Sequence, residues 1–151
     1  MSARGIRLQR LIDAPIEVTF HQWTDPVLRR QWCAPEDGWI TEATSDLRVG
    51  GTWSVRFGPT PEQMYSVDGV YLEVVPPERL VYSSVFRYPD GRSFQTQTTV
   101  LFEARSGQTL LTCVDAGFPA GDDLGMFDRG TVAVLNAFKR VVETSAPPRH
   151  Q

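Results

Sequence analysis

Apolar and polar residues alternate along most of the central part of the chain. Beyond Gly38, short alternating runs are separated by residues that favour turns. Three of these runs each place an apolar set on one face: Trp53, Val55 and Phe57; Leu80, Tyr82 and Phe86; and Phe94, Val100 and Phe102. A period of two, with polar residues in between, is typical of antiparallel strands with one packed face and one wetted face.

Turn residues separate these predicted strands. Gly50-Gly51 predicts a tight hairpin turn, because glycine accepts the positive φ that such turns need. Alternation fails between Tyr71 and Val74, which predicts a β-bulge there. Further turns are predicted at Pro76-Pro77-Glu78, Pro89-Asp90-Gly91 and Ser106-Gly107.

The two ends of the chain follow other patterns. Residues 6–13 alternate and predict a first strand, and Pro15 and Pro26 then open two short helices. After Pro119, apolar residues recur every three or four positions, which predicts a long amphipathic helix ending before Pro147. Asp122 or Asp123 would cap it, and its apolar stripe contains Leu124, Phe127, Thr131, Val134, Phe138 and Val141.

Together these elements predict an α+β domain of the helix-grip type. A curved antiparallel sheet of about seven strands would wrap around the long C-terminal helix, because an apolar sheet face and an apolar helix stripe must cover each other. We expect one domain over residues 1–144 and a flexible tail over residues 145–151.

Composition narrows the partners that such a domain could have. The 151 residues carry a formal net charge of −3 with scattered cations, which argues against nucleic acid. There is no apolar run long enough for a membrane span and no apolar signal-peptide core. Cys33 and Cys113 are unclustered, as expected for reduced thiols in the cytoplasm.

The sequence offers few residues for catalysis. It has no nucleophile elbow, phosphate-binding loop or dinucleotide fingerprint, so we expect no catalytic residue, metal or cofactor. His21 is interpreted as a surface or partly packed residue and Cys33 as a small, semi-buried residue, and Arg56 faces solvent by strand alternation. The expectation therefore leans towards a protein that is not an enzyme.

Small residues interrupt the faces that should pack. Ser84, Thr96 and Thr98 fall at inward positions of the strands, and Gly130 and Thr131 lie on the facing helix. These residues could leave a hollow that holds a ligand. Alternatively, the hydroxyls bond neighbouring backbone and Gly130 permits close contact between helix and sheet. The sequence leaves both interpretations open.

Several motifs occur in a characteristic order: Ile12-Asp13-Ala14-Pro15, Trp23-Thr24-Asp25-Pro26, Trp32 to Pro35, Asp46 to Gly51 with Trp53, and Gly69 to Val81. In this order they resemble the family named for the ATPase activator of heat-shock protein 90. That family belongs to the START-like superfamily, with the birch-pollen allergen and polyketide cyclases. The chain lacks the further sequence on which chaperone activation depends, so that role is not expected.

The chain departs from this family at two places. Cys33-Ala34 replaces a commonly found Trp and Gly, and Thr131 follows Gly130 where the family commonly has Trp. If those aromatics lie near the mouth of a cavity, as the resemblance implies, the cavity here is wider or differently shaped.

The resemblance implies a cavity that binds a small, largely apolar molecule between sheet and helix. The alternatives are a cofactor-independent enzyme of the polyketide-cyclase kind and a protein-interaction module. No membrane or nucleic-acid partner is expected, and a homodimer is allowed. The candidate ligand-binding residues are Trp32, Trp53, Tyr71, Ser84, Phe86, Thr96, Thr98, Phe127, Gly130 and Thr131.

Overall fold

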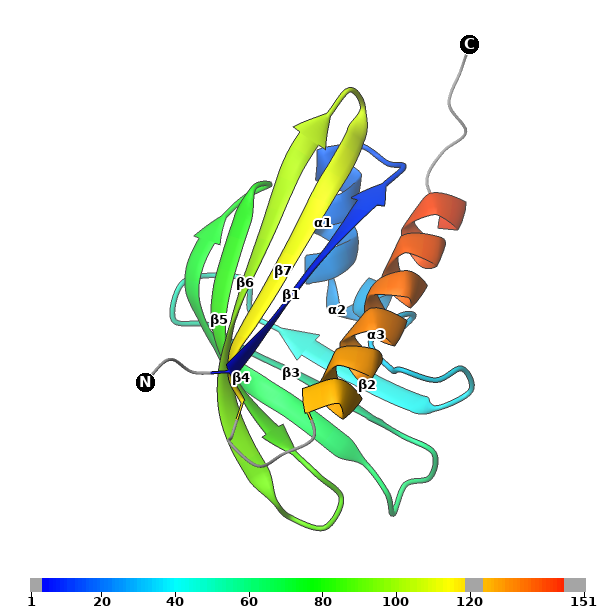
Figure 1. Cartoon of the computed structure of the whole chain (residues 1–151), viewed down its shortest axis with the longest axis vertical. Coiled ribbons are helices and arrows are strands. Elements are labelled where there is room, and N and C mark those ends of the chain that lie inside the picture. The colour runs from blue at the N-terminus through cyan, green and yellow to red at the C-terminus, as the bar shows by residue number, and fades with distance from the viewer. Residues whose placement is uncertain (1–3, 119–123, 146–151) are drawn as a thin grey trace.

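Seven antiparallel strands form one curled sheet, and a long helix lies across its concave side (Figure 1). The computed structural model describes the backbone of residues 4–118 and 124–145, and the side chains of residues 5–117 and 129–144. The elements are β1 (Arg4–Ile12), α1 (Ile16–Thr24), α2 (Pro26–Arg29), β2 (Ile40–Ser45), β3 (Thr52–Gly58), β4 (Tyr65–Val75), β5 (Arg79–Arg87), β6 (Ser93–Arg105), β7 (Gln108–Phe118) and α3 (Leu124–Ser145). The predicted helix-grip α+β fold is confirmed.

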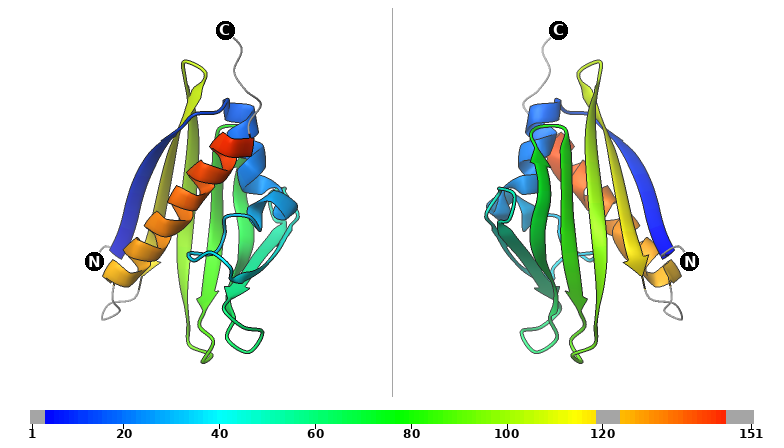
Figure 2. Two further views of the ribbon diagram at one scale, coloured as in Figure 1. Left: turned by 90° about the vertical axis from the view of Figure 1, so that its right-hand side faces the viewer. Right: turned by 90° about the vertical axis from the view of Figure 1, so that its left-hand side faces the viewer.

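The strand order is β1-β7-β6-β5-β4-β3-β2, so strands from β2 to β7 are hydrogen-bonded to their neighbours in the chain. Helices α1 and α2 connect β1, at one edge of the sheet, to β2 at the other. Figure 2 shows that α1 lies beside the C-terminal end of α3, which leaves the N-terminal end of α3 over a different part of the sheet.

Register decides which side chains reach the concave face. In β5 and β6, Phe86 pairs with Phe94 and Tyr82 pairs with Thr98. Paired numbers therefore have an even sum, and alternate residues of both strands share a face. The register of β4 and β5 shifts between Tyr71 and Glu73, which confirms the predicted bulge.

The connection between β2 and β3 is longer than predicted. It spans residues 46–51, so Gly50-Gly51 does not form a two-residue hairpin turn by itself. Gly50 does have a positive φ of 83°. Gly51 is needed for a different reason: a Cβ there would lie 2.0 Å from the carbonyl oxygen of Asp46. The two glycines thus meet separate requirements of a six-residue loop.

The two short helices begin as their polar residues predict, with small differences in extent. Pro15 occupies the N-cap of α1 and not its first turn. The Asp25 carboxylate accepts hydrogen bonds from the backbone N–H groups of Val27 (2.9 Å) and Leu28 (3.3 Å), and so caps α2. Helix α2 is only four residues long and ends at Arg29.

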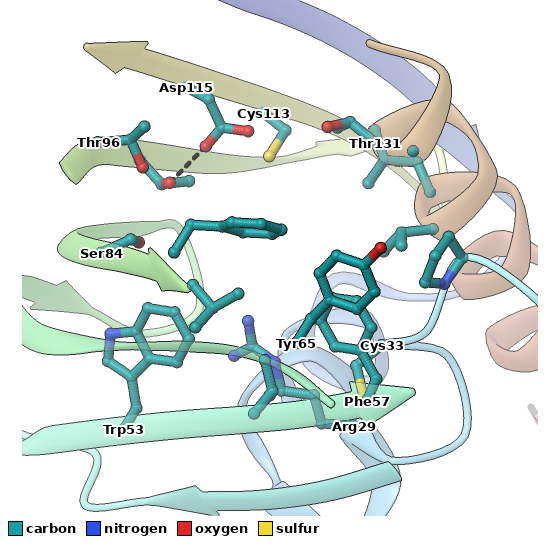
Figure 3. Close-up of a pocket in the computed structure, with 18 of the residues that line it drawn as sticks. Arg29, Cys33, Trp53, Phe57, Tyr65, Ser84, Thr96, Cys113, Asp115 and Thr131 are labelled. Carbon is teal, nitrogen blue, oxygen red and sulfur yellow. Dashed lines mark hydrogen bonds between the residues drawn. The ribbon is translucent and has the colours of Figure 1, made fainter. Parts of the chain in front are cut away.

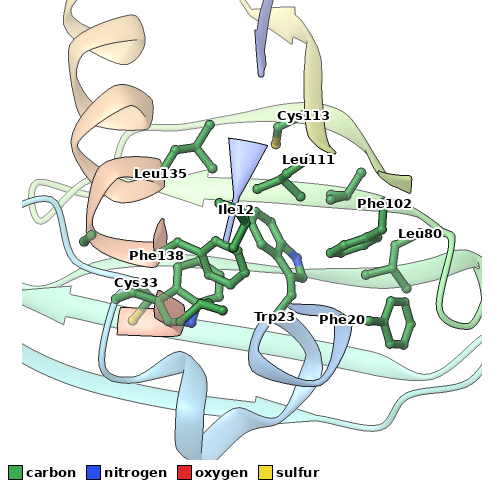
Figure 4. Packing of buried hydrophobic residues seen from close by; sticks show 14 of the residues in the cluster. Ile12, Phe20, Trp23, Cys33, Leu80, Phe102, Leu111, Cys113, Leu135 and Phe138 are labelled. Atoms are coloured by element: carbon green, nitrogen blue, oxygen red, sulfur yellow. The ribbon is translucent and has the colours of Figure 1, made fainter. Parts of the chain in front are cut away.

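The core lies between the sheet and the C-terminal half of α3. Phe138 and Val142 are fully buried there, and Trp23 of α1 packs against both Phe138 and Phe102 of β6 (Figure 4). The described part of the stripe predicted on this helix, Thr131, Val134, Phe138 and Val141, therefore faces the sheet, and Leu135 adds to it. The predicted cap at Asp122 or Asp123 and residues 146–151 of the predicted tail lie outside the described residues.

Candidate functional site

A cavity of about 310 Å³ lies between the sheet and the part of α3 that contains Gly130 and Thr131. Strands β3 to β7, helix α2 and the segment after it provide the rest of its wall. Figure 3 shows Asp115 and Cys113 on one side of the cavity, and Trp53, Arg29 and Phe57 on the other. Its size is at the lower end of the range for small-molecule sites, about 300–1,000 Å³.

Most of the wall is aromatic or aliphatic. Trp53, Val55 and Phe57 of β3 project into the cavity at alternate positions, as their spacing in the sequence predicts. Tyr65 stacks on Phe57 with ring centroids 5.6 Å apart, and Phe86 lies 5.9 Å from Tyr65. Such a wall favours an apolar ligand over a water-filled site.

The small inward residues surround open space. Ser84 and Thr96 are opposite each other in the β5–β6 pair, and both line the cavity. Neither hydroxyl forms a hydrogen bond with any residue that the structure describes. On α3, a Cβ placed on Gly130 would have no atom of the described residues within 4 Å. Gly130 therefore does not serve close helix–sheet contact, which was the alternative that the sequence left open.

Seven of the ten predicted site residues line this cavity: Trp53, Ser84, Phe86, Thr96, Thr98, Gly130 and Thr131. The side chain of Phe127 lies outside the described residues. The role of the predicted site residues in binding a ligand stays a prediction.

Trp32 and Tyr71 are not in the cavity wall. Trp32 packs in the closed core, where its ring lies 4.8 Å from that of Phe138 and its Nε1 donates to the carbonyl of Gln22 (3.2 Å). Tyr71 is also buried, and its hydroxyl is hydrogen-bonded to Ser45 Oγ at 2.7 Å. Both aromatic rings fill space next to the cavity. Tertiary packing decides how far each ring lies from the cavity, and strand parity does not describe that packing.

Asp115 is an acidic group in the wall that the sequence analysis missed. It lies on β7 directly opposite Thr98 of β6, whose hydroxyl donates a hydrogen bond to Asp115 Oδ1. Burial raises the pKa of the Asp115 carboxyl, and the hydrogen bond from Thr98 partly offsets this. Part of the residue's surface remains accessible. The alternation of Leu111, Cys113 and Asp115 in the sequence would have predicted its inward position.

Arg29 is the second missed residue and supplies a cation. Its guanidinium lies 5.7, 5.3 and 5.1 Å from the ring centroids of Trp23, Trp32 and Trp53, within reach of cation–π attraction. The residue is only 8% exposed, and it forms no ion pair or side-chain hydrogen bond with the residues that the structure describes. The sequence gives no signal that separates it from its neighbour Arg30.

Both cysteines line the cavity as free, buried thiols. Burial raises the pKa of the Cys113 thiol well above its ordinary value, and nearby Asp115 raises it further. Burial also raises the pKa of Cys33, although Arg29 opposes that shift. Neutral thiols are poor nucleophiles, so both groups act as apolar wall at neutral pH. The prediction of unbridged cysteines is confirmed.

Two other candidates lie on the surface as predicted. His21 is 66% exposed at its side chain, and its Nε2 is 3.7 Å from Asp25. Arg56 is also exposed and donates to Glu42 at 2.8 Å across the β2–β3 pair. Among the described residues no group of His, Cys, Asp and Glu side chains could hold a metal ion. None of the described helices has the length and apolar character to cross a bilayer.

A curled sheet around a C-terminal helix, with an aromatic cavity between them, defines a helix-grip domain of the START-like class. Residues 13–143 match the family described as Activator of Hsp90 ATPase homolog 1-like protein, and the chain belongs to this family. A search of the curated proteins finds no significant match.

Solved structures agree with this membership. The chain is 28% identical to protein CV1439 from Chromobacterium violaceum, with a TM-score of 0.81 and coverage of 92% of this chain and 97% of that one. It is 25% identical to Mll3558 from Rhizobium loti, with a TM-score of 0.78 and coverage of 91% and 96%. A solution structure of an AHSA1-like protein from Aeromonas hydrophila shares the fold at 24% identity, a TM-score of 0.79 and coverage of 98% and 99%.

Proposed function

We propose that this protein binds a small, largely apolar molecule in the cavity between the sheet and α3. The observation that carries the proposal is the open space around Gly130, where an added Cβ would meet no atom within 4 Å in the part of the chain that the structure describes. A glycine inside a helix costs about 1 kcal/mol relative to alanine, and here no close packing against the sheet offsets that cost. The hydroxyls of Ser84 and Thr96, without partners among the described residues, would orient the ligand.

Replacing Thr131 by tryptophan tests the proposal. Thr131 lines the cavity, so an indole at this position should fill the space that a ligand would take. We expect Thr131→Trp to lose binding of a neutral fluorescent dye while its melting temperature stays within a few degrees of the original. In a packed core the same change would cost about 1–3 kcal/mol through overpacking.

Thr144→Trp is the matched control. Thr144 is on the same helix but is exposed near its C-terminal end, so this variant adds the same indole outside the cavity. It should bind the dye like the original chain. Equal dye binding by Thr131→Trp would place the site elsewhere, and a large fall in its melting temperature would contradict the hollow.

Asp115 supports a second candidate function, a cofactor-independent enzyme of the polyketide-cyclase kind. A carboxyl group that keeps its proton at higher pH than usual, facing an apolar cavity, can act as a general acid or base on a bound ligand. The test is incubation with a linear poly-β-keto thioester, followed by mass spectrometry of the cyclised product. Cyclisation that is lost in Asp115→Asn would support an enzyme, and unchanged cyclisation in this variant would contradict the role of Asp115.

The proposal also covers the cellular compartment and the oligomeric state. Two free cysteines in the wall support a reducing compartment such as the cytoplasm. The homodimer that the sequence allows stays a prediction, to be measured by sedimentation.

A further inference from the structure

We propose that the ligand is an organic anion, with an acidic group that pairs with Arg29 and an apolar body that lies against the aromatic wall. This inference rests on the proposed binding function and names the chemical class of the molecule. It is carried by the surroundings of Arg29, which lack what a buried guanidinium needs.

A buried guanidinium needs both a compensating charge and hydrogen-bond acceptors. Its N–H donors, five in all, remain charged at every ordinary pH. Burying an unpaired charge is costly, and proteins usually offset that cost with a counter-ion. Arg29 is 8% exposed, its Nε is buried without a hydrogen-bond partner, and no described residue accepts from its terminal nitrogens.

The three tryptophan rings around Arg29 meet only part of this need. The ring faces of Trp23, Trp32 and Trp53 attract the positive charge at centroid distances of 5.1–5.7 Å. They hold the guanidinium in place against the cavity wall, but a ring face offers no conventional oxygen acceptor. A carboxylate, sulfonate or phosphate in the cavity would supply both the acceptors and the opposite charge.

The nearest carboxyl group in the cavity wall does not take this role. Asp115 accepts a hydrogen bond from Thr98 and lies on the other side of the cavity (Figure 3). Burial raises the pKa of Asp115 and the hydrogen bond from Thr98 lowers it, whereas Arg29 does not contribute to the shift. Both groups line the same cavity, so a ligand can place an acidic group at Arg29 and another part of its body towards Asp115.

The adjacent residue, Arg30, has different surroundings from Arg29. It is exposed, and its Nε donates to the backbone carbonyl of Thr41 at 3.2 Å. Arg30 thus has solvent and a hydrogen-bond partner, whereas Arg29 is buried and has no hydrogen-bond or ion-pair partner among the described residues. Of these two arginines, only Arg29 lines the cavity. Replacing one or the other removes the same charge from the chain but only one cation from the site.

The experiment uses pairs of probes that are matched in size and shape and differ in charge. Naphthalene-2-carboxylate and decanoate are each compared with the corresponding primary amide by calorimetry, on the original chain, Arg29→Gln, Arg29→Lys and Arg30→Gln. We expect the original chain and Arg30→Gln to prefer the acid about tenfold or more, as for other charge-assisted pairs. Arg29→Gln should lose the preference while still binding the amide, and Arg29→Lys should regain part of it.

Each other outcome has one meaning. Equal binding of acid and amide by the original chain would overturn the anion proposal and leave the proposed function standing. A preference that survives in folded Arg29→Gln would also overturn it. If the original chain binds no member of either pair, the proposed function fails, and this inference fails with it. Should Arg29→Gln not fold, the acid-to-amide ratio of the original chain and of Arg29→Lys still decides.

Discussion

The two ends of the space between α3 and the sheet differ in how they are filled. Below the C-terminal half of the helix, Phe138 is fully buried, with rings of Trp23 and Trp32 packed within about 5 Å of its own. Below Gly130, one to two turns from the N-terminus of the same helix, a cavity of about 310 Å³ remains. One helix on one sheet therefore has a closed core at one end and a hollow at the other.

The difference teaches that side-chain volume at facing positions, and not the backbone, decides where this fold is hollow. At the closed end, α1, β6 and α3 contribute large aromatic rings that pack together. At the open end, the strands contribute Ser84 and Thr96, and the helix contributes Gly130. Protein interiors pack densely where the side chains are large enough to fill the space between the elements. Small residues on both sides of that space therefore leave a void.

Removing the ring of Phe138 should have the largest effect. Phe138→Ala would leave a void among tightly packed rings, at a cost of about 3–5 kcal/mol in the free energy of unfolding. Val134→Ala, in the cavity wall, is the control and should cost about 1 kcal/mol, because its side chain already faces open space. Urea denaturation measures both. A cost of about 2 kcal/mol or more for Val134→Ala, as for a large-to-small change in a packed core, would contradict the difference between the two ends.

The second prediction concerns the pH dependence that Asp115 gives to stability. Its raised pKa means that the folded state holds the proton more tightly than the unfolded chain does. The stabilisation is thus complete below the ordinary carboxyl pKa, about 4, and is lost as pH rises through the raised value, by at most about 1.4 kcal/mol per pH unit.

Asp115→Asn cannot lose that proton. The difference in unfolding free energy between Asp115→Asn and the original chain should therefore move in favour of the variant as pH rises above about 4, and then level off. Denaturation at a series of pH values measures this difference. A difference that is constant with pH, or that moves in favour of the original chain, would show that the carboxyl is solvated.

The smallest effect is expected at Gly130 and has the opposite sign. Gly130→Ala should raise the free energy of unfolding by about 0.5–1 kcal/mol, because alanine is the better helix former and its methyl group meets open space. Gly69→Ala is the matched contrast, since a Cβ there would lie 1.7 Å from the carbonyl oxygen of Ser83. In thermal unfolding, Gly130→Ala should have the highest melting temperature, the original chain an intermediate one and Gly69→Ala the lowest. A destabilised Gly130→Ala would mean that the helix lies closer to the sheet.

The sequence by itself predicted much of this protein. Period-two alternation gave the inward positions of Trp53, Ser84 and Thr98, since the direction of a side chain from a strand follows from parity alone. Local chemistry likewise predicted the Asp25 cap of α2 and the bulge at Tyr71, because the hydrogen bonds and register involved are set by residues near in the chain.

Only the tertiary structure decided which inward residues meet the cavity and which charges it holds. Trp32 and Tyr71 are inward but lie in closed packing, and Arg29 and Asp115 reach the wall from α2 and β7. Distances between segments far apart in the chain depend on how helices dock on the sheet, and one-dimensional patterns carry no such distance. The enclosure of Arg29 by three tryptophans arises from α1, the turn after α2 and β3 meeting in space, which no local rule describes.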